Sequence, residues 1–417
     1  MKKIVFLIYV MSNGGVERHT VNLANEFVKN GYSVDIVATH GASEMQFFDF
    51  GENIRLLSVD EKREKINYVE TSTITKKENA ETKTKTDDYQ FMNNQRSKNQ
   101  SFKQRLMRKV IPIWKKSATL HKLNCRRYKR IYRDYFLEVK PEIVVSFGVN
   151  YFERAFYSTK GLNCKLFDAE IVAHDIVLPE NSPLSSYYCR MLKEARGIIV
   201  QTQSEKDFFN KINKNVSVIN NPIKTNLPAP YKADRRKTVV NYCRMSSQKN
   251  LLLLIEAFDL FHKEYPEYNL EIFANTVEPA DEKYKETVKE KISCLGLDDC
   301  VLIFPPAANV HDMVRDCAMF VSSSDYEGLS NSMLESMAIG LPCVCTDCLG
   351  GGTREVMVDH ENGLIVPVND PAAMYRAMKE FAENPELTEK CSQNAVKIRE
   401  MLSVERISKQ WMDFLRV

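Results

Sequence analysis

The chain has 417 residues, 44% of them hydrophobic and 27% charged, and its formal net charge is +3. This length exceeds one ordinary hydrophobic core, so we expect a soluble globular protein of two domains. The net charge is too small to predict nucleic-acid binding. The eleven cysteines are scattered, which favours free thiols in a reducing compartment over a disulfide framework or a zinc site.

The first expected element is a buried strand over residues 4–11, a continuous apolar run. A signal peptide is the alternative, but a charged amphipathic segment follows without a small-residue cleavage site. Residues 16–29 have apolar side chains at helical spacing, and Gly31 is expected to end this helix. A second strand over residues 32–38 completes a βαβ unit of the nucleotide-binding kind.

Gly14 and Gly15 lie between the first strand and the first helix. The full G-x-G-x-x-G pattern is absent, so a dinucleotide cofactor is not expected. Two adjacent glycines allow the backbone to approach a ligand closely at the carboxyl end of the strand. A tight turn without a ligand is the alternative.

Residues 60–100 are polar and predict a flexible insertion. Residues 102–133 are strongly basic, with aromatic and aliphatic side chains interleaved, and Pro112 interrupts any single helix. This pattern predicts contact with an anionic membrane surface. The alternative is a solvated face on a scaffold helix. Nucleic acid is not an expected partner because no recognition fold accompanies the charge.

A further strand is expected over residues 141–147. Apolar residues then run up to His174, which places its imidazole just past the end of a strand. Doubly wound sheets bind ligands at that edge, although a lone histidine is more often structural. The last strand of the first domain covers residues 197–202, with Ser204 as the N-cap of the next helix.

The second domain opens with a strand over residues 238–242 and a helix over residues 251–261. Arg244 and Lys249 lie on the loop between them. An arginine fork and a lysine point charge after a parallel strand can clamp phosphate. A chance solvated pair is the alternative.

Residues 324–338 carry the strongest functional signal, because they predict a strand end, a glycine turn and a helix start. Gly328 can adopt backbone conformations that residues with a Cβ avoid. Ser330 or Asn331 is the expected helix N-cap. The free N–H groups of such a helix start attract phosphate.

Glu327 and Glu335 lie on this turn and this helix. Two carboxylates beside an anion site suggest recognition of sugar hydroxyls, which donate hydrogen bonds to carboxylates. An ordinary βα turn with solvated glutamates is the alternative, and the E-x7-E spacing alone favours it.

The stretch as a whole resembles the signature of glycosyltransferase family 4, the retaining nucleotide-sugar enzymes of the GT-B fold. The matching residues are Glu327, Gly328, Leu334, Glu335, Met337, Ala338, Gly340, Leu341 and Pro342. Gly14-Gly15-Val16-Glu17 matches the family's "GGxE" loop. Arg244 and Lys249 match its "GRLxxxKg", although Cys243 and Met245 replace the glycine and leucine. The resemblance is strong over residues 235–370 and weak over residues 60–135.

The resemblance implies an α/β fold with two doubly wound, Rossmann-like domains facing a cleft. Residues 1–221 would form the acceptor-side domain, with an insertion at about residues 60–133, and residues 222–395 the nucleotide-sugar domain. Residues 396–417 would form a helix that crosses back onto the first domain.

The resemblance also implies roles for individual residues. Arg244 and Lys249 would neutralise the leaving diphosphate, and His174 would orient the sugar. Glu327 would bond the transferred sugar, and Glu335 the ribose hydroxyls. The catalytic residues are therefore expected to be His174, Glu327, Arg244 and Lys249. The donor-binding residues are expected to be Gly14, Gly15, Arg244, Lys249, Phe304, Pro305, Glu327, Gly328, Leu329, Ser330, Asn331 and Glu335. The chain has no D-x-D motif, so neither a catalytic metal nor another cofactor is expected.

The implied function is transfer of a hexose-type sugar from a nucleotide diphosphate sugar, with UDP favoured as the nucleotide. The basic stretch suggests a lipid-linked or cell-envelope glycan as acceptor, and a cytoplasmic protein peripheral to the inner membrane face. One alternative is a soluble transferase acting on a small molecule or a protein. A phosphorylase is weaker, since no lysine motif for a pyridoxal cofactor is present. Another alternative is a non-catalytic nucleotide-sugar-binding or membrane-adaptor subunit.

Overall fold

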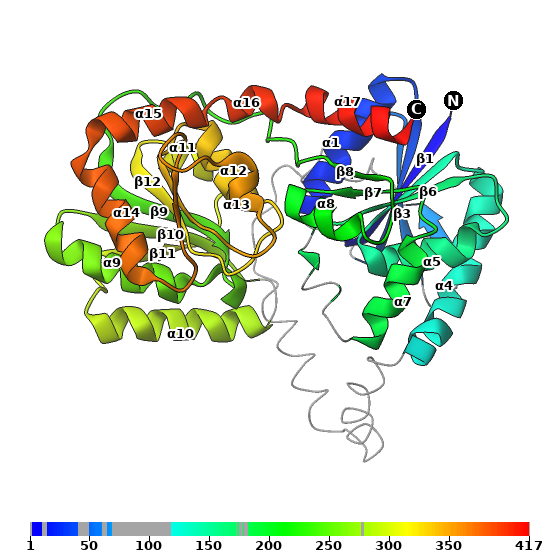
Figure 1. Ribbon diagram of the computed structural model, residues 1–417, viewed down its shortest axis with the longest axis horizontal. Coiled ribbons are helices and arrows are strands. Elements are labelled where there is room, and N and C mark those ends of the chain that lie inside the picture. Colours follow the sequence, from blue (N-terminus) through cyan, green and yellow to red (C-terminus); the bar gives the residue numbers. More distant parts are fainter. Residues whose placement is uncertain are drawn as a thin grey trace, which may run out of the picture. The chain divides into compact units, whose positions relative to one another are not determined.

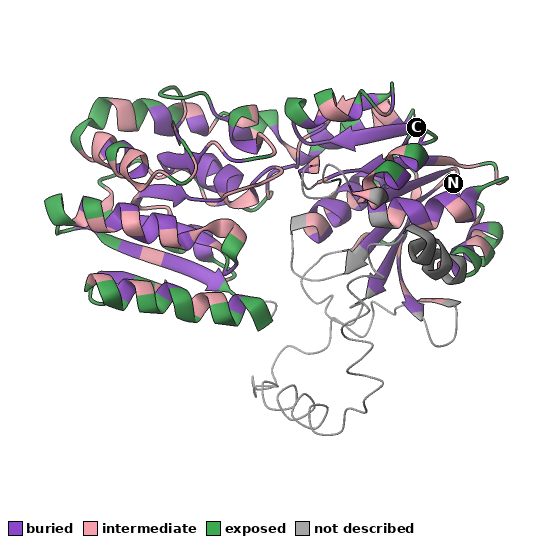
Figure 2. Ribbon diagram, turned by 60° about the horizontal axis from the view of Figure 1, so that its bottom comes forward, coloured by how far each residue is buried: buried purple, intermediate pink, exposed green. Residues whose placement is uncertain are grey.

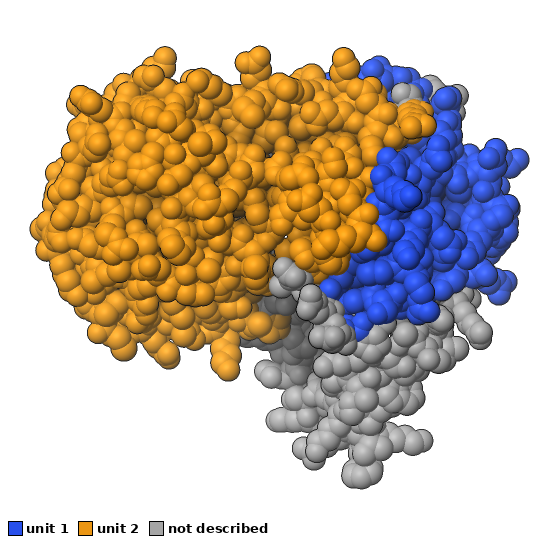
Figure 3. Space-filling model, viewed as in Figure 1, with its two compact units in different colours: residues 1–169, 175–198, 212–215 blue, residues 170–174, 199–211, 216–417 orange. Residues whose placement is uncertain are grey.

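The computed structural model describes residues 2–10, 15–40, 50–60, 65–68, 118–171, 173, 174, 178, 182–276 and 279–416. The chain divides into two compact units (Figure 3). Unit 1 comprises residues 1–169, 175–198 and 212–215, and unit 2 comprises residues 170–174, 199–211 and 216–417. The domain boundaries predicted at residues 221 and 395 stay a prediction.

An eight-stranded sheet has the strand order β4-β3-β2-β1-β5-β6-β7-β8 (Figure 1). Its strands are β1 (Lys3–Val10), β2 (Ser33–His40), β3 (Ile54–Asp60), β4 (Lys65–Tyr68), β5 (Ile143–Phe147), β6 (Lys165–Ala169), β7 (Gly197–Val200) and β8 (Val216–Val218). Strands β3, β2, β1, β5 and β6 pair in parallel. The expected first strand is therefore central, and its apolar side chains from Ile4 to Ile8 are buried.

The accompanying helices are α1 (Gly15–Lys29), α4 (Ala118–Val139), α5 (Val149–Thr159), α7 (Pro183–Leu192) and α8 (Gln203–Phe209). Gly31 follows α1 at a φ of 86°, as the expected helix stop requires.

Three expectations for this part of the chain were wrong in detail. Residues 65–68 form an edge strand antiparallel to β3 rather than part of an insertion, because Ile66 and Tyr68 alternate with polar residues. Strand β6 ends at Ala169, so His174 lies five residues beyond it. Thr202, not Ser204, is the N-cap of α8, since its side chain accepts a hydrogen bond from the Glu205 N–H. Most of the predicted insertion, residues 69–117, lies outside the described residues.

A six-stranded sheet lies in unit 2 and has the order β11-β10-β9-β12-β13-β14. Its strands are β9 (Arg236–Arg244), β10 (Asn269–Asn275), β11 (Val301–Phe304), β12 (Cys317–Ser322), β13 (Cys343–Thr346) and β14 (Leu364–Val366). All five neighbouring pairs are parallel. The carboxyl ends of these strands therefore meet at one edge, where doubly wound sheets bind ligands.

Helices lie on both sides of this sheet in Figure 1. The helices that follow β9 in the chain are α9 (Leu251–Glu264), α10 (Pro279–Leu295), α11 (Val310–Val314), α12 (Asn331–Ala338), α13 (Gly352–Val356), α14 (Pro371–Glu383), α15 (Pro385–Ala395), α16 (Ile398–Met401) and α17 (Val404–Leu415). The strands and the inner helix faces are buried (Figure 2). Leu254, Phe258 and Phe261 of α9 are fully buried in this core. The expected crossing of the last helix onto the first domain stays a prediction.

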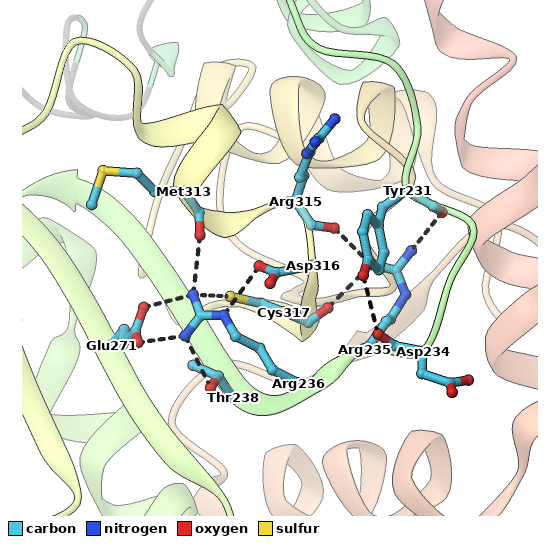
Figure 4. Close-up of polar contacts among 10 residues, drawn as sticks. All are labelled: Tyr231, Asp234, Arg235, Arg236, Thr238, Glu271, Met313, Arg315, Asp316 and Cys317. Carbon is cyan, nitrogen blue, oxygen red and sulfur yellow. Dashed lines mark hydrogen bonds and ion pairs between the residues drawn. The ribbon is translucent and has the colours of Figure 1, made fainter.

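Two consecutive arginines, Arg235 and Arg236, form hydrogen bonds at the amino end of β9 (Figure 4). Arg236 Nη1 lies 2.5 Å from Glu271 Oε1, and Arg236 Nε lies 3.1 Å from Asp316 Oδ1. Arg235 donates to backbone carbonyls instead, including that of Arg315 at 2.9 Å. All these groups are hydrogen-bonded within the protein, so they stabilise the sheet.

The described part of the basic stretch is the helix α4, of which the side chains are described from Tyr128 onward. Arg133 donates to the carbonyl oxygens of Ser158 (3.2 Å) and Lys160 (2.8 Å), where α5 ends. This arginine therefore caps a helix. No helix within the described ranges is long and apolar enough to cross a membrane. Contact with a membrane surface stays a prediction.

Candidate functional site

The signature stretch forms the turn from β12 into α12, as predicted. Ser330 is the N-cap of α12, and its hydroxyl accepts a hydrogen bond from the Met333 N–H. Gly328 is needed for a different reason than the one expected, because its φ is not positive. A Cβ at Gly328 would lie 2.4 Å from the carbonyl oxygen of Ile171, so only glycine fits this close backbone contact.

Glu327 and Lys249 form an ion pair whose side chains are only 12% and 17% exposed. Ser324 donates a hydrogen bond to the same carboxylate at 2.8 Å. Burial works to lower the pKa of Lys249, but the neighbouring Glu327 carboxylate outweighs burial, and the pKa is raised. Lys249 is therefore charged at neutral pH. Lys249, which is expected to bind phosphate, and Glu327, which is expected to bind the sugar, are therefore in direct contact.

The loop after β9 is bound to the signature loop by several hydrogen bonds. The Gln248 side chain donates to the Tyr326 carbonyl at 2.8 Å, and the Asp325 N–H donates to the Gln248 carbonyl at 2.9 Å. Asn250 has a left-handed backbone (φ 41°) and donates to the Asp325 carboxylate at 2.7 Å. These contacts fix Lys249 beside Glu327 although 78 residues separate them.

Arg244 is the last residue of β9 and is exposed. The only hydrogen bond that its side chain makes to the described residues is a long one of 3.4 Å, from Nη2 to Gln248 Oε1. Its guanidinium therefore keeps most of its donors for a ligand at the carboxyl edge of the sheet.

Glu335 is buried in α12 beside a residue that the sequence analysis missed. His311 Nε2 lies 2.7 Å from Glu335 Oε2, and the two side chains are 7% and 10% exposed. The ring of Tyr242 packs edge-on against this imidazole, with centroids 5.6 Å apart. His311 lies on the five-residue helix α11, and no local sequence pattern marks it. The pair fixes the orientation of the carboxylate that is expected to bind ribose.

His174 is held by a second missed residue, Glu205. The carboxylate of Glu205 lies 2.9 Å from His174 Nδ1 and also accepts the His174 backbone N–H. Phe208 stacks on the imidazole with ring centroids 3.8 Å apart. Glu205 therefore orients the ring so that Nδ1 faces the carboxylate.

Residues 170–174, which include His174, belong to unit 2 and lie beside the loop that joins β12 to α12. Thr202 donates a hydrogen bond to the Gly350 carbonyl at 2.8 Å. A Cβ at Gly350 would lie 3.2 Å from Ala173 Cβ and 1.9 Å from the Glu327 carbonyl oxygen. Because Gly350 has no side chain, Ala173 and the backbone of Glu327 can both pack closely against it.

The other predicted donor residues are spread more widely. Phe304 ends β11 and stacks on Phe273 with centroids 5.0 Å apart, and Pro305 follows it in an exposed position. Leu329 is 6% exposed and belongs to the core. Asn331 begins α12. Gly15 begins α1 in unit 1, and Gly14 lies outside the described residues.

Within the described ranges, no group of three or more histidine, cysteine, aspartate or glutamate residues is placed to hold a metal ion. The ten cysteines whose side chains are described are free thiols. Arg244, Lys249 and the start of α12 supply positive charge or N–H donors instead. Such an arrangement can bind a diphosphate, while Glu327 and Glu335 can accept hydrogen bonds from hydroxyls. The predicted absence of a catalytic metal stays a prediction.

Residues 223–398 match the family described as glycosyl transferases group 1. The matched residues include Arg244, Lys249, His311, Glu327 and Glu335, so the signature stretch, the loop after β9 and His311 all lie within the match.

Similar proteins extend the comparison to the whole chain. An uncharacterized glycosyltransferase of Haemophilus influenzae is 24% identical over 100% of both chains. An N-acetylgalactosamine-N,N'-diacetylbacillosaminyl-diphospho-undecaprenol 4-alpha-N-acetylgalactosaminyltransferase of Campylobacter jejuni is 30% identical over 39% of this chain and 42% of its own. The structure of an S. aureus TarM mutant in complex with Fondaparinux, alpha-GlcNAc-glycerol and UDP has a TM-score of 0.72 at 17% identity and covers 100% of both chains. The chain therefore has the GT-B fold of two Rossmann-like α/β domains, as predicted.

Proposed function

We propose that this protein is a retaining glycosyltransferase that moves a hexose-type sugar from a UDP-sugar to a lipid-linked or cell-envelope glycan. The observation that carries the proposal is the buried Lys249–Glu327 pair beside the exposed Arg244. Such a site offers cations to a diphosphate and a carboxylate to a sugar. The Campylobacter relative acts on a diphospho-undecaprenol-linked glycan, and TarM was solved with UDP, which supports both the acceptor class and the nucleotide.

In the proposed reaction the bond between the anomeric carbon and the diphosphate oxygen breaks, and the acceptor oxygen bonds to the same face of that carbon. The acceptor proton passes to the departing phosphate oxygen. Arg244 and Lys249 stabilise the negative charge that develops on the diphosphate, without a metal ion. Glu327 stabilises positive charge at the anomeric carbon, and Glu335 binds the ribose. His174, oriented by Glu205, contacts the sugar.

A donor screen tests this function. The purified protein is incubated with UDP-, GDP- and ADP-sugars, with and without EDTA, while thermal stabilisation and nucleotide release are measured. We expect one UDP-sugar to respond and EDTA to have no effect. The Glu335→Ala variant should bind UDP more weakly than the wild type. A response that requires a divalent cation contradicts the proposed mechanism, and no response to any nucleotide favours a non-catalytic adaptor.

The proposed site of action is the inner face of the cytoplasmic membrane, to which the protein would bind peripherally. The basic residues of α4 that stay exposed, including Lys129 and Arg130, support this proposal. Flotation with vesicles tests it. We expect binding to vesicles that contain anionic lipid, and its loss in high salt. Binding that ignores both lipid charge and salt contradicts the membrane proposal and leaves the donor chemistry untouched.

A further inference from the structure

One arginine of unit 1 is held in place without a carboxylate partner among the residues that the structure describes. The guanidinium carbon of Arg154 on α5 lies 3.9 Å from the ring centroid of Tyr128 on α4 and 5.1 Å from that of Tyr151. Arg154 Nη1 donates a 3.1 Å hydrogen bond to the hydroxyl of Thr39. Aromatic faces attract a cation, so the two rings and the hydroxyl fix the position of the guanidinium.

Two other arginines of unit 1 use their donors within the protein. Arg55 pairs with the buried carboxylate of Asp35, with Nε at 2.8 Å, and Arg133 binds the carbonyls at the end of α5. In contrast, no carboxylate among the described residues contacts Arg154. A guanidinium has five N–H donors, and Thr39 accepts one of them. Arg154 is therefore a half-buried, fixed cation with donors available for a ligand.

The position of Arg154 in the fold also favours a ligand. Thr39 is the last residue but one of β2, at the carboxyl end of a parallel strand. Tyr151 and Arg154 lie in the first turns of α5, which begins just after the carboxyl end of β5. Because β2, β1 and β5 are parallel neighbours, these groups gather at the carboxyl edge of the sheet. Ligands of doubly wound sheets bind at that edge.

We propose that Arg154, held against the rings of Tyr128 and Tyr151, binds a phosphate group of the acceptor substrate. The flat fork of a guanidinium matches two phosphate oxygens, and the stacked rings keep the fork oriented before the ligand arrives. The proposal rests on the proposed function, since it gives the acceptor of that reaction a phosphate-bearing chemistry. The phosphate could belong to a lipid diphosphate or to a polyol-phosphate polymer.

Binding measurements on the full chain test the proposal without any transfer reaction. Farnesyl diphosphate and an oligomer of glycerol phosphate serve as probes, and farnesol and glycerol serve as uncharged controls. Excess UDP is present so that the probes do not occupy the donor site. We expect at least one phosphorylated probe to bind, and the Arg154→Met variant to bind it about tenfold or more weakly. The probe that depends on Arg154 identifies the source of the phosphate.

The Arg190→Met variant is the matched control, because Arg190 is an exposed arginine of unit 1 on α7. It removes the same charge and should bind the probe as the wild type does. If Arg154→Met does not fold, Arg154→Lys decides, since it keeps the charge but loses the fork and should bind about fivefold more weakly. Equal losses in Arg154→Met and Arg190→Met, unchanged affinity in the folded Arg154 variant, or no binding of either phosphorylated probe overturns the proposal. If the phosphorylated probe binds through Arg154 but no UDP-sugar binds, the proposed function fails and the phosphate site stands.

Discussion

The two ends of strand β9 carry arginines in opposite situations. At the amino end, Arg236 contacts the carboxylates of Glu271 and Asp316. At the carboxyl end, Arg244 is exposed, and its side chain makes one long hydrogen bond to the described residues, to Gln248. The same residue type therefore stabilises the sheet at one end and is available to a ligand at the other. In a parallel sheet this division is expected, because the loops that bind ligands follow the carboxyl ends of the strands.

The largest expected effect concerns Lys249, which lies at the carboxyl end and yet is paired. Lys249→Met leaves the Glu327 carboxylate buried without its cation, which should lower the free energy of unfolding by about 3–5 kcal/mol. Denaturant unfolding measures this loss, and the sugar-transfer assay should show loss of activity. The double variant Lys249→Met/Glu327→Gln should recover stability but not activity. Full activity in the folded double variant would show that the pair is structural only.

Arg236→Met tests the amino end. Removal of the guanidinium leaves Glu271 and Asp316 close together, so the free energy of unfolding should fall by about 2 kcal/mol. The melting temperature should drop by several degrees, while kcat and KM of the folded enzyme stay unchanged. A raised KM for the donor with normal stability would show that Arg236 binds the substrate rather than stabilises the sheet.

Arg244→Met is the matched substitution at the carboxyl end. We expect the stability to change by less than about 0.5 kcal/mol, because the side chain is exposed and weakly bonded. The KM for the nucleotide sugar should rise by about thirtyfold, which corresponds to the loss of one charge-assisted hydrogen bond to phosphate. Thermal unfolding and initial-rate kinetics measure the two quantities. A destabilised variant with a normal KM would assign Arg244 to the scaffold.

The smallest expected effect concerns His311, which acts through Glu335. His311→Phe removes the hydrogen bond to the carboxylate, so the KM for the donor should rise by about fivefold while kcat is retained. The same change should weaken the binding of free UDP, which calorimetry measures. His311→Gln keeps a donor in this position and should restore part of the affinity. If kcat falls and UDP affinity does not, Glu335 does not bind the nucleotide.

The sequence by itself determined the type and order of most elements and the motif that marks the site. Buried parallel strands are continuous apolar runs, and a helix start such as Ser330 has a local signal, so both can be recognised within a few residues. The charges of Arg244 and Lys249 were identified in the same way, by their spacing after a strand.

Only the tertiary structure determined which of these side chains contact one another. Glu335 meets His311 across 24 residues of sequence, and His174 meets Glu205 across 31. Gly328 is required because the Ile171 backbone passes against it, not because of its own backbone angles. The spacing of residues in the sequence does not predict such contacts, because they depend on how the strands pair and the loops pack. The sequence therefore identified the charged groups. The fold determined which of them form pairs and which are available to a ligand.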